Sequence, residues 1–227
     1  MPFYPVRKDF AFDVQCHAKC GHTLKSNVAT ILCDEHGTEY PFGPTCARNH
    51  LDEDGAAQLR RIPDFTKAAP GQDREGGKRV DGEHSGGGVR DDEAAKFKRI
   101  VTYMLLRQER LAHIPGAQLD VLGQYHAAYL EEGALSDDAV RHIGNIEKKT
   151  AGGRYGYNNL QTVYAFDRCI ERAIRGIPED RRSFVGDILR YLRDNLYLTQ
   201  KQIDGLDKWL KRIDGYLPLD PSGFWKR

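Results

Sequence analysis

The sequence predicts a mainly α-helical chain with a small α+β domain at its N-terminal end. Cysteine and histidine concentrate in residues 15–51, residues 66–90 are rich in glycine and charge, and apolar residues recur at helical spacing through residues 91–215. These patterns divide the chain into a small domain at 1–65, a flexible linker, an all-α bundle of about six helices and an irregular tail at 216–227.

The composition limits what the chain can bind. Its 227 residues are 40% hydrophobic and 30% charged, with a formal net charge of +1, so any binding of nucleic acid requires a local basic patch. No apolar run approaches the roughly 20 residues that cross a bilayer, and the N-terminal residues lack a secretion signal. Five cysteines interleaved with histidines favour metal binding in a reducing compartment. We expect a cytoplasmic protein with no membrane partner, and we identify no small-molecule substrate.

The N-terminal domain is expected to contain a hairpin followed by a helix. Residues 28–33 are β-branched and apolar, which predicts a strand, and residues 38–40 return as a second strand that ends before Pro41. Thr45 is then a candidate N-cap for a helix that begins at Cys46. We expect too few apolar residues here for a hydrophobic core, so another interaction must hold the domain together.

Four residues have the pattern of a closed, structural zinc site. Cys16 and Cys20 are close in sequence, and Gly21 allows the tight turn of a zinc knuckle. Cys46 and His50 are four residues apart, so both would lie on one face of the first helical turn. Two ligands from the knuckle and two from the helix would fill a tetrahedral Zn²⁺ shell.

Other ligand sets remain open. Three residues separate Cys16 from Cys20 where two are usual, so His17 could replace Cys16 as the first ligand. Cys33, His36 and His22 are further reserves, although Cys33 on a strand is typical of a small buried residue and His36 of a solvated turn. The alternative for the whole group is a set of free thiols packed in a small core.

The order of knuckle, hairpin and helix resembles a treble-clef zinc finger. It is similar to small treble-clef-like domains of bacterial and phage proteins, which read Cys-x-x-Cys-Gly, then Asp-x-x-Gly, then Gly-x-x-Cys. The matching positions here are Cys20-Gly21, Asp34 to Gly37 and Gly43 to Cys46, and the likeness covers about a sixth of the chain. The resemblance implies zinc but no fixed activity, because treble clefs bind nucleic acid, bind protein or serve only structure.

Six helices are predicted after the linker. Apolar periodicity, capping residues and helix-breaking residues place them at 91–112, 118–132, 137–149, 160–175, 179–195 and 200–214. Ser136 is predicted to cap the third helix, and Thr199 with Gln202 forms a capping box for the sixth. Residues 129–149 weakly resemble residues 191–212, which indicates either a duplicated helical hairpin or only similar hairpin sequences.

A basic stripe with nearby aromatic residues is the candidate nucleic-acid surface. Arg168, Arg172 and Arg175 recur at helical spacing on one helix, and a Gly-rich loop with tyrosines precedes that helix. The complete predicted set is Lys148, Lys149, Arg154, Tyr155, Tyr157, Arg168, Arg172 and Arg175. The alternative is that the stripe is only the solvated face of an amphipathic helix.

These patterns favour a non-enzymatic zinc-finger accessory protein that binds DNA or RNA within a larger bacterial or phage assembly. The alternative is a protein-interaction adaptor or scaffold with a structural zinc. Phe224 and Trp225 in the tail would either strap the helical domain or contact a protein partner. A metal-dependent nuclease is the least favoured class, because His36 in a turn is poorly placed as a general base. Cys169 lies mid-helix and is expected to be buried and inert.

Overall fold

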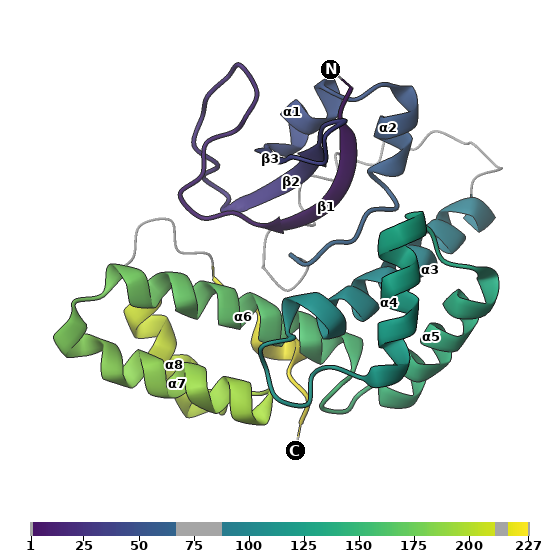
Figure 1. Ribbon diagram of the computed structural model, residues 1–227. Coiled ribbons are helices and arrows are strands. Elements are labelled where there is room, and N and C mark those ends of the chain that lie inside the picture. Colours follow the sequence, from purple (N-terminus) through teal and green to yellow (C-terminus); the bar gives the residue numbers. More distant parts are fainter. Residues whose placement is uncertain (1, 67–87, 212–217, 227) are drawn as a thin grey trace. The chain divides into compact units, whose positions relative to one another are not determined.

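The computed structural model describes residues 2–66, 88–211 and 218–226. The described chain is mainly helical, with a small three-stranded antiparallel sheet near the N-terminus, which confirms the predicted fold class at that level (Figure 1). It forms two compact units, Met1–Val101 and Thr102–Arg227, divided inside helix α3 (Gly88–Leu105). Most of the predicted linker at 66–90 lies outside the described residues.

The sheet of the first unit has the strand order β1 (Tyr4–Phe10), β2 (Val28–Cys33) and β3 (Glu39–Phe42). The predicted hairpin is present, but β3 continues through Pro41, where the sequence predicted an end. Proline is tolerated there because β3 is an edge strand. The Pro41 carbonyl accepts a hydrogen bond of 2.8 Å from the His17 backbone N–H, so the knuckle lies against this edge.

Helix α1 (Pro44–Asn49) follows β3 and begins two residues earlier than predicted. Its N-cap is Gly43, without a side-chain cap, so Thr45 is not the cap. Proline suits the first helical position because its fixed φ matches the helix and its missing N–H would have had no partner there. Cys46 therefore lies in the first turn of the helix rather than at its first residue. A second short helix, α2, spans Glu53–Gln58.

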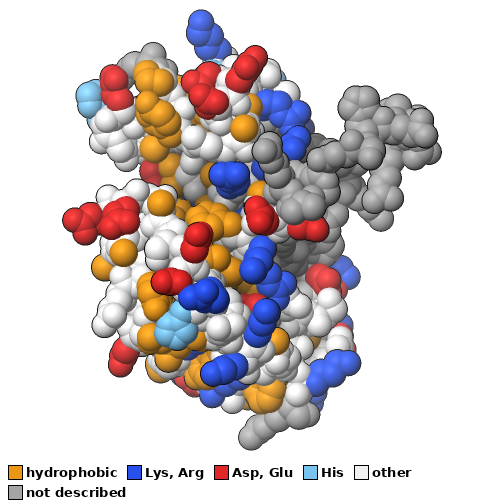
Figure 2. Space-filling view, turned by 90° about the vertical axis from the view of Figure 1, so that its right-hand side faces the viewer, with side chains coloured by type: hydrophobic (Ala, Val, Ile, Leu, Met, Phe, Trp, Pro, Cys, Tyr) orange, Lys and Arg blue, Asp and Glu red, His pale blue; other side chains and the backbone are white. Residues whose placement is uncertain are grey.

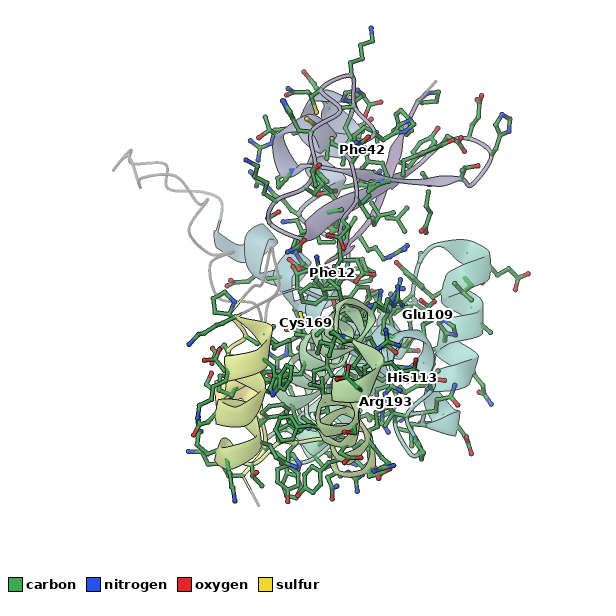
Figure 3. The ribbon with its side chains drawn as sticks, turned by 90° about the vertical axis from the view of Figure 1, so that its left-hand side faces the viewer. Phe12, Phe42, Glu109, His113, Cys169 and Arg193 are labelled. Carbon is green, nitrogen blue, oxygen red and sulfur yellow. The ribbon has the colours of Figure 1, made fainter. Side chains whose placement is uncertain are left out.

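The first unit has a small hydrophobic core, which the sequence analysis did not expect. Most of its members are small or lie in the sheet, and they are Ala11, Cys16, Ala18, Leu24, Ala29, Ile31, Leu32, Phe42 and Ala47. Alanines allow backbone segments to approach closely, so few large side chains are needed; Phe42 on β3 is one of them (Figure 3). Cys16 belongs to this core, which ties the cysteine cluster to the packing of the sheet.

A buried carboxylate fixes the outer edge of β1. The Lys8 N–H donates to Pro63 O at 2.9 Å, and Phe65 N–H donates to Lys8 O at 3.1 Å. Between them, Asp64 accepts from the Thr66 hydroxyl at 2.7 Å and pairs with Lys98 Nζ at 3.4 Å. Burial pushes the pKa of Asp64 upward, but Lys98, Thr66 and Lys8 together outweigh burial and hold it below its usual value.

The second unit consists of helices, and each predicted helix has a counterpart. A π-helix at Leu106–Arg110 continues α3. The helices that follow are α4 (Asp120–Glu132), α5 (Asp137–Thr150), α6 (Tyr157–Gly176), α7 (Arg182–Asn195) and α8 (Gln200–Leu210). Short 3₁₀ turns lie at Glu179–Arg181 and Pro221–Gly223. Helix α6 is the most deeply buried and lies beside α7 (Figure 1). Among the described helices, none is long and apolar enough to span a membrane.

Two of the three predicted helix caps are confirmed. Ser136 accepts a hydrogen bond from Ala139 N–H, and Thr199 forms a reciprocal capping box with Gln202. Gly133 lies three residues before Ser136, and Leu196 lies three residues before Thr199. Both Gly133 and Leu196 have the left-handed backbone conformation, with φ of 67° and 57°. The α4–α5 and α7–α8 hairpins therefore share one turn design, while a true duplication stays a prediction.

The C-terminal tail packs on helix α6. Phe224 is 8% exposed and its ring centre lies 4.9 Å from that of Phe166. The Trp225 backbone N–H donates to the Asn159 side-chain oxygen at 2.9 Å. Asn159 is itself buried and donates to the backbone carbonyls of Arg154 and Leu196. Tail residues Phe224 and Trp225 thus contact their own chain, in agreement with the strap alternative.

Candidate metal centre

A tight knuckle brings the first two cysteines together. The Cys16 N–H donates to His22 O at 2.9 Å, and Gly21 N–H donates to Ala18 O at 3.0 Å. Gly21 has a φ of +56°, a left-handed conformation in which a side chain would be strained. The turn therefore needs glycine at this position, as the sequence predicted, and it folds the chain back between Cys16 and His22.

Helix α1 supplies the third cysteine. The sulfur atoms of Cys16, Cys20 and Cys46 all lie within 4.8 Å of one another, and the Cys20 and Cys46 sulfurs are 3.6 Å apart. Two thiolates on one tetrahedral Zn²⁺ would be about 3.8 Å apart, given Zn–S bonds of about 2.3 Å. The Gly43 N–H also donates to Cys16 Sγ at 3.3 Å. These three cysteines are close enough to bind a metal ion, and their spacing fits the dimensions of a zinc–thiolate site.

The three thiols influence one another's protonation. The His22 backbone N–H and the neighbouring Cys46 lower the pKa of Cys20. The hydrogen bond to Cys20, with burial, raises the pKa of Cys46 to about 11. The hydrogen bond between the two thiols therefore favours the thiolate form of Cys20 and the protonated form of Cys46. A bound cation would favour the thiolate form of both.

His50 is not part of the cluster of close donor atoms. Its Nδ1 lies 2.8 Å from the Cys46 carbonyl oxygen, and its ring centre is 5.1 Å from that of Phe42. A hydrogen bond from Nδ1–H to that carbonyl leaves the lone pair on Nε2, which is the tautomer of most metal-bound histidines. The role of His50 as fourth ligand stays a prediction.

The reserve ligands lie elsewhere. His17 stacks on Tyr40 at 4.1 Å between ring centres, and His36 is exposed beside Glu35. Cys33 at the end of β2 is half-buried and lies outside the core cluster, so it is not the fully buried residue that the strand pattern indicated. His22 is exposed and contributes its backbone to the knuckle. None of these residues joins the three-cysteine cluster among the described residues.

Comparison of the chain with protein-family models, curated proteins and solved structures finds no match in any of the three.

Several of the predicted nucleic-acid residues make contacts within the second unit. Arg154 Nη2 donates to Asp194 O at 2.5 Å, and Tyr155 lies between the guanidinium groups of Arg107 and Arg154, 4.9 and 5.6 Å from the ring centre. Tyr157 begins α6 and is buried, so it is not a loop residue as predicted. Arg168 pairs with Glu171 at 3.1 Å.

The other predicted residues are more accessible but do not form one compact patch. Lys148, Lys149 and Arg175 are exposed, and Arg172 is half-buried. Arg175 lies about 27 Å along α6 from Tyr157, at 1.5 Å per residue. On the face drawn in Figure 2, Lys and Arg side chains are interspersed with Asp and Glu side chains. Any phosphate backbone would therefore contact scattered cations along the helix.

The helical unit contains a buried polar network that was not predicted from the sequence. Asp167 on α6 is fully buried and accepts from Arg193 Nε at 2.7 Å, with His113 Nε2 at 3.2 Å (Figure 3). Arg193 also pairs with Glu171 at 2.5 Å. A signal was present, because Asp167 directly follows Phe166 on the apolar face of α6, where a carboxylate must find partners.

Proposed function

We propose that this chain is a non-enzymatic accessory protein with a treble-clef-like finger that holds a structural Zn²⁺. Cys16, Cys20 and Cys46 supply three ligands, and His50 supplies the fourth through Nε2. The convergence of three thiols from two separate segments carries the proposal. A structural role is favoured because four ligands would leave no open position for a substrate or an activated water.

The zinc content of the purified chain tests this assignment. We expect one zinc ion per chain by elemental analysis, and His50→Ala should weaken binding without abolishing it. His36→Ala is the matched control, because its exposed ring lies outside the cysteine cluster and its replacement should leave zinc affinity unchanged. Absence of zinc in protein prepared without chelators would overturn the assignment.

Nucleic acid is the proposed partner, bound within a larger assembly. Support comes from Lys148, Lys149 and Arg175, which are exposed and make no ion pair among the described residues. Three contacts to a single strand would give a slope of log affinity against log salt of about −2. Such binding would be weak and sensitive to salt, as befits one component of an assembly.

Charge reversal tests whether binding depends on these three side chains or on any exposed lysine or arginine of the chain. The triple variant Lys148→Glu, Lys149→Glu, Arg175→Glu should abolish oligonucleotide binding in a fluorescence-anisotropy titration. Lys201→Glu with Lys208→Glu is the matched control, since both lysines are exposed on α8. Equal binding by the triple variant and the native chain would exclude this surface.

A protein-interaction adaptor is the second candidate. Among the described residues of the helical unit, large apolar side chains are exposed at Val121 (39%), Phe184 (45%) and Leu130 (64%). Leu130→Glu with Phe184→Glu should then release a stoichiometric co-purifying protein while leaving zinc content and helicity unchanged. Salt-sensitive nucleic-acid binding that persists in this variant would favour the first candidate.

A further inference from the structure

Cys20 and Cys46 are the two more accessible cysteines of the three-cysteine cluster. Cys20 is exposed and Cys46 is half-buried, and their sulfurs are 3.6 Å apart although the residues are 26 positions apart in sequence. A disulfide bond is about 2.05 Å long, so the two sulfurs need to approach by about 1.5 Å. Side-chain rotation supplies a movement of this size.

The remaining cysteines are poorly placed to compete. Cys16 is buried in the core cluster, and its sulfur accepts the Gly43 N–H. Cys33 lies outside the cluster of close thiols. Cys169 is buried in α6, where burial raises the pKa of its thiol to about 12. Reaction at the surface is therefore directed to one pair.

We propose that Cys20 and Cys46 form an oxidation site at which a peroxide produces one reversible disulfide and displaces the bound metal. The release of metal rests on the proposed zinc site. Formation of the disulfide requires only the two thiols and is independent of that proposal.

The reaction takes two electrons from sulfur. The Cys20 thiolate attacks one oxygen of hydrogen peroxide, the O–O bond breaks, and a sulfenic acid and hydroxide form. The Cys46 thiolate then attacks the Cys20 sulfur, the S–S bond forms, and a second hydroxide leaves. Both hydroxides take up protons as water. A zinc ion held by the proposed site would lose two of its donors and would be released as Zn²⁺.

The disulfide would connect the same two segments that the metal connects. Cys20 lies at the end of the knuckle and Cys46 on α1, so the oxidised chain keeps a covalent link where the zinc ion had joined them. The finger would thus exchange one cross-link for another, with Cys16 left as a thiol. A dithiol reductant with added zinc should restore the first state.

Peroxide treatment of the zinc-loaded full chain tests the inference. Released zinc is measured with a chromogenic chelator, and disulfides are mapped on non-reduced tryptic peptides. Trypsin cleaves after Lys19 and Lys25, which places Cys16 and Cys20 on different peptides. We expect one zinc released for each disulfide, with the peptide of residues 20–25 linked to that of residues 26–48.

Two variants make the mapping decisive. Cys33 shares the tryptic peptide of Cys46, so Cys33→Ser must give the same linkage and the same zinc release. Cys169→Ser should also behave as the native chain. Linkage through Cys16, or a sulfinic acid on Cys20 without a disulfide, would overturn the inference. If the purified chain holds no zinc, the metal proposal fails, while the peptide map still decides whether the Cys20–Cys46 disulfide forms.

Discussion

The two compact units are stabilised by different kinds of contact. The first unit combines a small hydrophobic core with a cluster of three cysteines, one of which, Cys16, belongs to that core. The second packs its helices around α6, where Asp167 and Asn159 are buried and hydrogen-bonded to distant segments. Chemistry at sulfur should therefore control the stability of the first unit, while the second should depend on packing and on satisfied polar groups.

Removal of the metal is expected to have the largest effect and to separate the units most clearly. A strong chelator should remove hydrogen-exchange protection from β2 and leave α6 protected, because a structural metal contributes folding free energy only to the unit that binds it. Cys169→Ser should not change either result. If β2 stays protected without metal, the hydrophobic core alone is sufficient to keep the first unit folded.

The reverse test perturbs the helical unit. Asp167→Ala removes the fully buried partner of Arg193, which keeps its pair with Glu171, and we expect a loss of about 2–3 kcal/mol in unfolding free energy. Metal content of the first unit should be unchanged. Asp138→Ala is the control, because the Asp138–Arg141 pair is exposed and should contribute less than about 0.5 kcal/mol. Denaturant unfolding monitored by circular dichroism measures the unfolding free energy of both variants. Equal losses would show that the buried ion pair stabilises the fold no more than the exposed one.

A pH-dependent test applies to the buried carboxylate of the first unit. Lys98→Ala should cost about 2 kcal/mol at neutral pH, because Asp64 loses its charged partner. The pKa of Asp64 is lowered in the folded state, so its contribution is complete above the unfolded pKa of about 4 and is lost as pH falls through the folded value. The stability difference between native chain and variant should shrink below about pH 4. A difference independent of pH would assign the effect to packing.

The smallest expected effect concerns the tail. A Cβ at Gly223 would lie 2.1 Å from Thr162 Oγ1, so Gly223→Ala should displace the tail from α6 at a cost of about 1 kcal/mol. Gly186→Ala is the matched control, since its Cβ would meet no atom within 4 Å and should stabilise α7 by up to about 1 kcal/mol. The rate of limited proteolysis at the C-terminus should rise in Gly223→Ala and stay unchanged in Gly186→Ala. An unchanged cleavage rate in Gly223→Ala would show that the tail is not held by this contact.

The sequence predicted local features well because their causes are local. The caps at Ser136 and Thr199 and the turn at Gly21 depend on residues within a few positions, and all are present as expected. The prediction of Thr45 as a cap was wrong because Pro44 can itself begin the helix. The core of the first unit was missed because alanines signal little by hydrophobicity alone but pack closely when strands and helix meet.

Sequence alone predicted the mainly helical class and the helices of the second unit, because periodicity and capping depend on nearby residues. It predicted Cys16, Cys20 and Cys46 among several possible metal ligands, and only the structure showed that these three converge. Tertiary structure decided which charged side chains find hydrogen-bond or ion-pair partners within the chain. Arg154 reaches a carbonyl 40 residues away, and Asp167 meets His113 from 54 residues away. Such pairings depend on how helices pack, so no local pattern can separate a binding arginine from a structural one.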